Sequence, residues 1–315
     1  MSLVPSLKLN SGYHIPQIAF GTFDSPKDDV IKSVEYAIDT GFRHIDCAIF
    51  YNNEVEVGQA IAAGMKKNNL KREDLFVTSK LWCDMHAPEN VRKSCEQSIK
   101  NLGVQYLDLY LIHWPMSFQF KKDVPFDIMD SNTLVYEHHK IEDTWKAMEQ
   151  LVTAGLVKSI GVSNFNKRQI ERIIAQSSIA PAVNQVEVNL HWLNEKLIEF
   201  CHSKNIHVEA YAPLGSPGFM KGQAQPLVQQ PNVVEIAQKH NKTPGQVLLR
   251  HALQRGIVVL TKSVTPDRIA SNFEVFDFML TKEEMEKLNK TGMNQRIFHV
   301  PAFAKHPEYP FHDEY

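Results

Sequence analysis

Apolar positions along the chain repeat with two alternating periods. Short, mostly apolar runs are followed by longer stretches in which apolar residues recur every three or four positions. The first pattern is typical of a buried β-strand, and the second of an amphipathic helix. In residues 28–40, for example, Val30, Val34 and Ile38 fall on one helical face. The alternation predicts a chain built from strand–helix units.

The pattern sets the expected order of the elements. Strands are predicted at residues 15–22, 43–48, 75–81, 107–113, 159–164, 182–188, 207–213 and 258–263. Helices are predicted at residues 28–40, 53–68, 88–102, 142–154, 167–175, 194–204, 233–240, 244–255 and 266–272. Residues 7–18 predict a β-hairpin, because two short alternating runs flank Asn10-Ser11-Gly12. Residues 114–141, 214–231 and 292–315 show no clear period and are expected to be long loops.

Strict strand–helix alternation favours a parallel sheet. Eight such units match a (β/α)8 TIM barrel in number and total length. The alternative is a doubly wound open sheet, which usually carries a glycine-rich turn after its first strand, and neither G-x-G-x-x-G nor a P-loop motif occurs. We therefore expect residues 1–315 to form a single (β/α)8 TIM barrel domain, with an N-terminal β-hairpin and long loops at its C-terminal face.

The composition excludes several classes of protein. The 315 residues are 43% apolar and carry a net charge of -2, so neither nucleic acid nor an anionic membrane is an expected partner. There is no signal-peptide core and no apolar run long enough to span a membrane. Cys47, Cys83, Cys95 and Cys201 form no C-x-x-C pair, which argues against disulfides and structural zinc. We expect a cytoplasmic monomer without a bound metal.

Side chains at the C-terminal ends of barrel strands surround the active site in this fold. Every predicted strand ends in polar or aromatic residues: Thr22, Asp46, Lys80 with Trp82, His113 with Trp114, Ser163 with Asn164, Gln185, Tyr211, and Lys262 with Ser263. Tyr51 lies in the loop after the strand that ends near Asp46. This rim predicts an enzyme.

Four rim residues form a chemical group. Tyr51 is a weak acid because a phenol has a pKa of about 10, but a nearby Lys80 ammonium would lower that pKa. Asp46 could hold Lys80 protonated, and His113 could orient a substrate oxygen. The group would then donate a proton to a developing alkoxide. The alternatives are that Lys80 is only a structural partner of Asp46 and that His113 is a core histidine.

The chain resembles the aldo-keto reductases, and closely their aldose/aldehyde reductase branch. The matching motifs run almost end to end: residues 41–48 with Tyr51, Asn53 and Glu54, residues 79–82, 111–115, 161–165, 184–187, 210–216 and 262–265 with Arg268 and Asn272, and the tail at 309–312. The resemblance implies a catalytic tetrad of Asp46, Tyr51, Lys80 and His113, with Tyr51 as the proton donor. It also implies NADPH as the cofactor, bound across the barrel mouth without a Rossmann fold.

The resemblance assigns each part of NADPH to residues of this chain. Near the nicotinamide these are Thr22 and Asp46 at the ribose, Ser163, Asn164 and Gln185 at the carboxamide, and Tyr211 stacked on the ring. Leu214 and Ser216 would cover the pyrophosphate. At the adenosine end these are Lys262, Ser263, Val264, Thr265 and Arg268 for the 2′-phosphate and Asn272 for adenine.

The expected substrate is a small carbonyl compound in an apolar pocket. The pocket residues are Phe23, Trp82, His113, Trp114, Phe126 and His299, although core packing is the alternative for each aromatic ring. Three positions depart from many relatives: Phe23 replaces Trp, Thr261 replaces Pro, and Ser271 replaces Glu. The first changes the substrate pocket, and the last weakens the expected contact to adenine.

The sequence thus predicts an NADPH-dependent oxidoreductase that reduces aldehydes or ketones to alcohols. One alternative is a barrel glycosidase, which needs two carboxylates at one site. Glu187 and Glu209 are the candidates, but both lie inside apolar strand runs. The other alternative is a binding or redox-sensing subunit, which an N-terminal interaction segment would favour, and little precedes Leu7.

Overall fold

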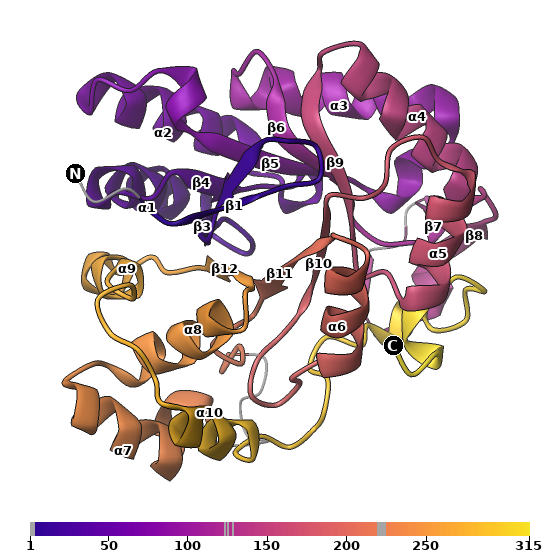
Figure 1. Cartoon of the computed structure of the whole chain (residues 1–315). Helices are drawn as coiled ribbons and strands as arrows, with labels where there is room; N and C mark the ends of the chain where they lie inside the picture. Colours follow the sequence, from indigo (N-terminus) through magenta and orange to yellow (C-terminus); the bar gives the residue numbers. More distant parts are fainter. Residues whose placement is uncertain (1–3, 123, 125, 128, 219–224) are drawn as a thin grey trace.

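The computed structural model describes residues 4–315 except 123, 125, 128 and 219–224 (Figure 1). Eight parallel strands close into a barrel in which the first, β3, pairs with the last, β12. In chain order they are β3 (Ile18–Gly21), β4 (His44–Asp46), β5 (Phe76–Leu81), β6 (Leu107–Ile112), β9 (Val157–Ser163), β10 (Val183–Glu187), β11 (His207–Tyr211) and β12 (Val258–Thr261). The predicted (β/α)8 barrel is confirmed, with strand ends one to three residues shorter than expected at most positions.

Helices surround the barrel (Figure 1). They are α1 (Lys27–Thr40), α2 (Glu54–Lys67), α3 (Pro88–Leu102), α4 (Ile141–Thr153), α5 (Lys167–Gln176), α6 (Glu195–Ser203), α7 (Pro231–His240), α8 (Pro244–Gln254), α9 (Pro266–Phe273) and α10 (Lys282–Asn289). The apolar pattern does not predict α10, although the capping box of Thr281 and Glu284 marks its start. In the part of the chain that the structure describes, no helix is long and apolar enough to cross a membrane.

Successive side chains of each strand point alternately outward to the helices and inward to the centre of the barrel. On β4, Ile45 packs outward with the buried residues of α1, such as Val34 and Ile38. The intervening side chains of His44 and Asp46 point the other way, into the barrel, because successive strand residues face opposite sides. Polar groups inside the barrel are therefore shielded from water by the helical layer.

A hairpin closes the N-terminal end of the barrel. Strands β1 (Ser6–Lys8) and β2 (His14–Pro16) are antiparallel, as predicted. The hairpin contacts the starts of distant strands, since Asn10 Nδ2 donates to the carbonyl of Pro181 at 2.9 Å and His207 Nε2 lies 2.9 Å from the carbonyl of Lys8. The opposite end, where the strands finish, stays available for a site.

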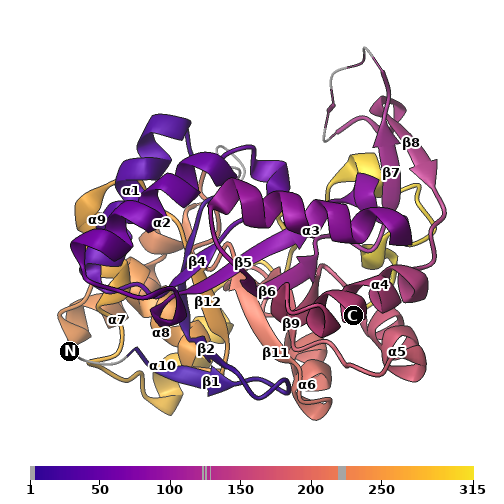
Figure 2. The same ribbon diagram turned by 90° about the horizontal axis from the view of Figure 1, so that it is seen from above.

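The predicted irregular loop at 114–141 contains a second hairpin. Strands β7 (Ser117–Phe120) and β8 (Leu134–Glu137) pair antiparallel and project beyond the barrel (Figure 2). The strands are too short to give a periodic signal in the sequence, and they form because the buried Phe118 ring packs on Phe303 of the C-terminal tail, with ring centroids 5.0 Å apart. Residues 123, 125, 128 and 219–224 of the predicted loops lie outside the described residues.

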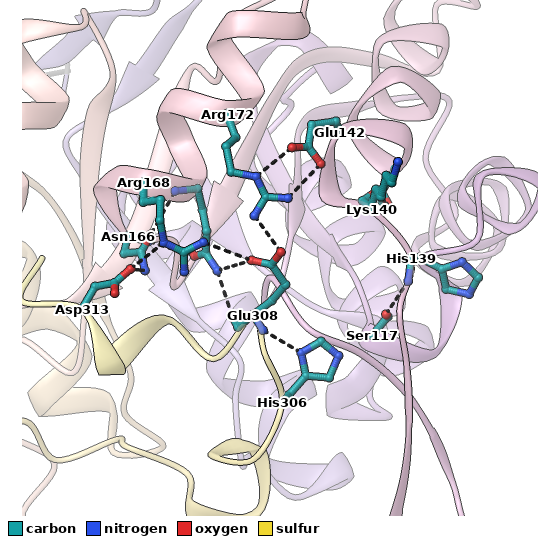
Figure 3. A network of polar contacts seen from close by, with 12 residues as sticks. Ser117, His139, Lys140, Glu142, Asn166, Arg168, Arg172, His306, Glu308 and Asp313 are labelled. Atoms are coloured by element: carbon teal, nitrogen blue, oxygen red, sulfur yellow. Dashed lines mark hydrogen bonds and ion pairs between the residues drawn. The ribbon is translucent and has the colours of Figure 1, made fainter.

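Ion pairs fasten the C-terminal tail to the outer helices (Figure 3). Arg172 on α5 bonds both oxygens of Glu142 on α4, at 2.8 and 3.0 Å, and Glu308 of the tail at 2.7 Å. His306 contributes a further bond at 2.8 Å to the carbonyl of Glu137 on β8. These contacts place the tail beside the β7–β8 hairpin at the mouth of the barrel.

Candidate active site at the C-terminal mouth of the barrel

Lys80 is the centre of the polar contacts at the barrel mouth. This fully buried side chain lies in β5 beside β4, whose last residue is Asp46. Its ammonium donates to Asp46 Oδ1 at 2.7 Å, to the carbonyl of Cys47 at 2.8 Å and to the hydroxyl of Tyr51 at 3.2 Å. Thr22 supports the same strand end, because its hydroxyl donates to the carbonyl of Asp46 at 2.9 Å. Lys80 therefore connects a carboxylate to a phenol, with all three of its N–H bonds satisfied.

Burial and neighbouring charges have opposite effects on the pKa values of Lys80 and Tyr51. Burial alone would lower the pKa of Lys80, but the Asp46 carboxylate and Tyr51 outweigh it and the pKa is raised, so Lys80 stays charged. Burial raises the pKa of Tyr51 to about 12, although Lys80 opposes the rise. The expectation of a lowered phenol pKa is thus wrong for this structure, because desolvation exceeds the effect of the ammonium.

His113 lies next to Tyr51 and is neutral at physiological pH. Its ring centroid is 5.7 Å from that of Tyr51 and 5.0 Å from that of Trp82. Burial, and then the charge of Lys80, hold the pKa of His113 well below its usual value. Its buried Nδ1 atom has no hydrogen-bond partner in the described part of the chain. A neutral imidazole offers one N–H donor and one acceptor beside the phenol.

A second set of polar side chains lies on β9, β10 and β11. Asn164 adopts a left-handed backbone conformation (φ 62°), which asparagine tolerates better than most residues. Its Oδ1 accepts from the hydroxyl of Tyr211 at 2.7 Å, and its Nδ2 donates to Ser163 Oγ at 3.2 Å. The Ser163 hydroxyl in turn donates to the carbonyl of Gln185 at 2.8 Å. The four residues that the sequence assigns to the nicotinamide carboxamide and ring are thus one connected group.

The two glutamates of the glycosidase alternative have separate partners. Glu187 accepts from the backbone N–H groups of Ile297 and Phe298, each at 2.9 Å, and so anchors the segment before the tail. Glu209 is fully buried and accepts from Gln185 Nε2 at 2.9 Å. The sequence offers Glu209 only as a glycosidase candidate and not as part of the cofactor site, although a carboxyl two positions before Tyr211 in an apolar strand is a signal for a site residue.

Aromatic rings gather beside His113. Trp82 is stacked on Phe50, with ring centroids 3.7 Å apart, and Phe126 lies 6.4 Å from Phe50. Trp114 packs edge-on against Phe303 of the tail at 5.3 Å. Phe50 and Phe303 are not predicted from the sequence, because only the folded chain brings them to Trp82 and Trp114. Most of this group is a packed cluster, as the core-packing alternative expects.

Two further predicted pocket residues lie at the edge of this group. Phe23 is 43% exposed and packs edge-on against Tyr51 at 5.1 Å, so it presents an open ring face next to the phenol. His299 is exposed, and its carbonyl accepts a hydrogen bond from the hydroxyl of Tyr309. The backbone of His299 is therefore held by Tyr309, a member of the aromatic cluster.

The segment after β12 presents cations at the same end of the barrel. Lys262 and Arg268 are exposed, and neither forms an ion pair within the described residues. Lys262 Nζ donates to the carbonyl of Asp24 at 3.1 Å. Ser263 Oγ accepts from the N–H of Thr265, the residue before α9, whose own side chain makes no capping bond. Two cations without acidic partners beside a helix N-terminus fit a phosphate group.

The other residues assigned to the cofactor lie on the loop after β11 and on the segment from β12 into α9. Leu214 and Ser216 follow β11, and Ser216 has a positive φ of 40°. Val264 is 45% exposed, and Asn272 is buried in α9. Ser271, which replaces a glutamate of many relatives, bonds Thr243 Oγ1 at 3.3 Å. The residues present therefore fit an extended dinucleotide phosphate.

Comparisons with known proteins agree with this geometry. The model of the Aldo/keto reductase family matches residues 17–292. Aldo-keto reductase family 1 member A1 of Gallus gallus is 44% identical over 98% of this chain and 97% of its own length, and Estradiol 17 beta-dehydrogenase 5 of Mus musculus is 44% identical over 98% of each. The aldose reductase structure from Schistosoma japonicum is 48% identical (TM-score 0.91, 99% of this chain, 100% of the other). A Bombyx mori aldo-keto reductase in complex with NADP is 38% identical (TM-score 0.90, 98% and 100%).

Proposed function

This chain belongs to the aldo/keto reductase family, and on that premise we propose that it reduces aldehyde or ketone carbonyls to alcohols with NADPH. The observation that carries the proposal is the buried Lys80 ammonium, which contacts both Asp46 and the hydroxyl of Tyr51. That arrangement supplies a proton donor whose conjugate base is stabilised by a fixed positive charge. The relative solved with NADP supports the choice of cofactor.

The proposed chemistry divides between the cofactor and four side chains. NADPH, when bound, supplies a hydride to the carbonyl carbon. Tyr51 donates its proton to the carbonyl oxygen, and its raised pKa keeps it protonated at neutral pH. Lys80 stabilises the phenolate that remains, while Asp46 holds Lys80 in place. Neutral His113 donates an N–H to the same oxygen and orients the carbonyl group.

We propose that NADPH is held as the sequence resemblance implies. The nicotinamide end contacts Thr22, Asp46, Ser163, Asn164, Gln185 and Tyr211, the pyrophosphate contacts Leu214 and Ser216, and the adenosine end contacts Lys262, Ser263, Val264, Thr265, Arg268 and Asn272. The bonds that join Ser163, Asn164, Gln185 and Tyr211 support the first group. The exposed cations without acidic partners support the last.

The proposed substrates are apolar aldehydes and ketones. Phe23, Trp82, Trp114 and Phe126 would line the pocket with Phe50, and His299 would lie at its edge. The family alone does not set the substrate, since its members named here include an aldose reductase and an estradiol 17 beta-dehydrogenase. Cytoplasmic location and a monomeric state stay predictions, to be checked by cell fractionation and light scattering.

The direct test is turnover of NADPH with a simple aromatic aldehyde. We expect one alcohol to form for each NADPH oxidised, measured by NADPH absorbance and by chromatography of the product. An aryl glycoside is the matched control, and we expect no hydrolysis of it. Glu187, one of the two candidate glycosidase carboxylates, is already hydrogen-bonded to the backbone N–H groups of Ile297 and Phe298. Release of the aryl alcohol from the glycoside without NADPH consumption would contradict the proposed function.

Replacing Arg268 with methionine should weaken NADPH binding roughly 10- to 100-fold and leave NADH binding nearly unchanged. Arg268 is exposed beside the start of α9, and a hydrogen bond to a charged group contributes about 1.5–3 kcal/mol. NADH lacks the 2′-phosphate that this guanidinium would bind. Quenching of tryptophan fluorescence at one fixed salt concentration measures both affinities.

A matched control for this change is Arg92→Met on α3, an exposed arginine whose partner is Glu96 rather than a ligand. It should alter neither affinity. Equal losses of affinity for NADPH and for NADH in Arg268→Met would show that Arg268 does not bind the 2′-phosphate.

The pH dependence of the two reaction directions should be opposite in sign. Reduction needs protonated Tyr51, and a group is protonated below its pKa, which burial raises to about 12. We therefore expect kcat/KM for reduction to stay flat with rising pH and to fall only as the pH approaches about 12, while alcohol oxidation, which needs the deprotonated phenol, rises toward the same pH. His113 should add no step near neutral pH because its pKa lies well below 6.5. A step near neutral pH that disappears in His113→Gln would refute the neutral imidazole.

A further inference from the structure

Glu209 is a fully buried carboxyl group directly below the proposed nicotinamide site. It lies on β11 two residues before Tyr211, so both side chains are on the same face of the strand. In the register of the sheet it is opposite Gln185 on β10. Burying a carboxyl is costly unless it is paired or hydrogen-bonded, so its retention inside the barrel calls for a role.

Glu209 and Asp46 together use both N–H bonds of one amide. Gln185 Nε2 donates to Glu209 Oε2 at 2.9 Å and to Asp46 Oδ2 at 2.9 Å. Asp46 is the ion-pair partner of Lys80, and an ionised carboxylate can only accept. The NH2 end of the Gln185 amide therefore points to the two carboxyl groups, and its carbonyl oxygen is left for a donor. Without Glu209, one N–H would lose its acceptor, and Asp46 alone would hold the NH2 end of the amide.

The opposite side of Glu209 explains how the site tolerates a second acid. The titratable groups around it are His44, Asp46, Lys80 and, through Lys80, Tyr51. Burial, followed by the charge of Asp46, raises the pKa of Glu209, and burial lowers the pKa of His44 to about 3. Both groups are then neutral, so the cluster holds the single ion pair of Lys80 and Asp46. Glu209 Oε1 has no hydrogen-bond partner within the described residues and lies 3.6 Å from His44 Nε2.

We propose that Glu209 is a positioning residue for the nicotinamide carboxamide. It acts through Gln185, whose amide it fixes so that the carbonyl oxygen accepts an N–H bond from the carboxamide NH2 group. The inference rests on the proposed use of NADPH and adds a residue that does not itself touch the cofactor. The carboxyl supplies an acceptor oxygen for Gln185, whereas packing alone would be served by an apolar side chain of similar size.

The test compares two variants and three ligands by fluorescence titration. Glu209→Met removes the acceptor at similar volume, and Glu209→Gln keeps a carbonyl acceptor. The ligands are NADP+, its 3-acetylpyridine analogue, which lacks the carboxamide NH2 group, and 2′-phospho-ADP-ribose, which lacks the ring. In Glu209→Met we expect NADP+ to bind about 10-fold more weakly, and the other two ligands to bind as they do to the wild type. Glu209→Gln should bind all three like the wild type.

Several results would overturn the inference. One is equal loss of NADP+ and the acetylpyridine analogue in Glu209→Met, which would mean that Glu209 acts by charge or packing. Loss that extends to 2′-phospho-ADP-ribose, or no loss at all, would do the same. If Glu209→Met does not fold, the wild type alone provides a test. It should bind NADP+ about 10-fold more tightly than the acetylpyridine analogue. Equal affinities for the two ligands would refute the inference. Failure of the wild type to bind NADP+ at all would instead contradict the proposed function.

Discussion

Replacing Tyr51 with phenylalanine is expected to lower the rate of carbonyl reduction about 10²- to 10⁴-fold. The change removes only the hydroxyl that lies 3.2 Å from Lys80 Nζ and keeps the ring that packs against Phe23 and His113. The carbonyl oxygen then has no side-chain acid within reach except neutral His113, whose remaining N–H is a much weaker acid than a phenol. Single-turnover measurement of NADPH oxidation checks the step directly.

NADPH affinity and thermal stability should be nearly unchanged in the same variant. The proposed cofactor contacts come from other side chains, and the ring packing of Tyr51 is retained. Tyr13→Phe is a matched control, because Tyr13 is exposed in the hairpin at the far end of the barrel. Near-full turnover of Tyr51→Phe would show that another group supplies the proton.

Replacing Lys80 with methionine should abolish turnover and destabilise the fold by about 3–5 kcal/mol. Lys80 is fully buried, and its removal leaves the Asp46 carboxylate in the barrel interior with Gln185 as its remaining side-chain donor. An unpaired buried charge costs much more than the lost attraction, since desolvation is no longer compensated. Urea unfolding followed by circular dichroism measures the loss.

The double variant Asp46→Asn with Lys80→Met distinguishes this explanation from a simple packing defect. Removing the charge together with its partner should restore most of the stability, while turnover stays lost. Lys67→Met, which breaks the exposed pair with Asp39, is the control and should change stability little. A double variant as unstable as Lys80→Met alone would mean that the unpaired charge is not the cause.

The departure at Thr261 is expected to be tolerated. Thr261, where many relatives have proline, lies in the barrel wall, and its hydroxyl donates to the carbonyl of Ala19 at 3.3 Å across the closing pair of strands. Its polar atom is therefore satisfied despite burial. Phe23 is the departure that we expect to bear on substrates, because its exposed ring contacts Tyr51.

The sequence by itself determined the order of the elements, the barrel and the residues at its rim. The apolar periods are local, and eight strand–helix units with right-handed crossovers leave few ways to close a sheet. In a (β/α)8 barrel, the position of a residue along its strand sets how far it lies from the C-terminal mouth. The sequence alone therefore places Asp46, Lys80 and Gln185 at or near the mouth. Short elements with weak apolar periods, such as α10 and the β7–β8 hairpin, are not predicted from the sequence.

The tertiary structure alone decided the environment of those residues. The pKa of Tyr51 is raised because burial by surrounding segments outweighs Lys80, and no local pattern reports burial of that kind. The orientation of the Gln185 amide depends on Asp46 and Glu209, which lie 139 and 24 positions away in the chain and meet only when the barrel closes. Identity and spacing along the chain set which chemical groups reach the mouth. Desolvation and hydrogen bonding between distant strands set their protonation and direction, because both depend on neighbours that the sequence does not place side by side.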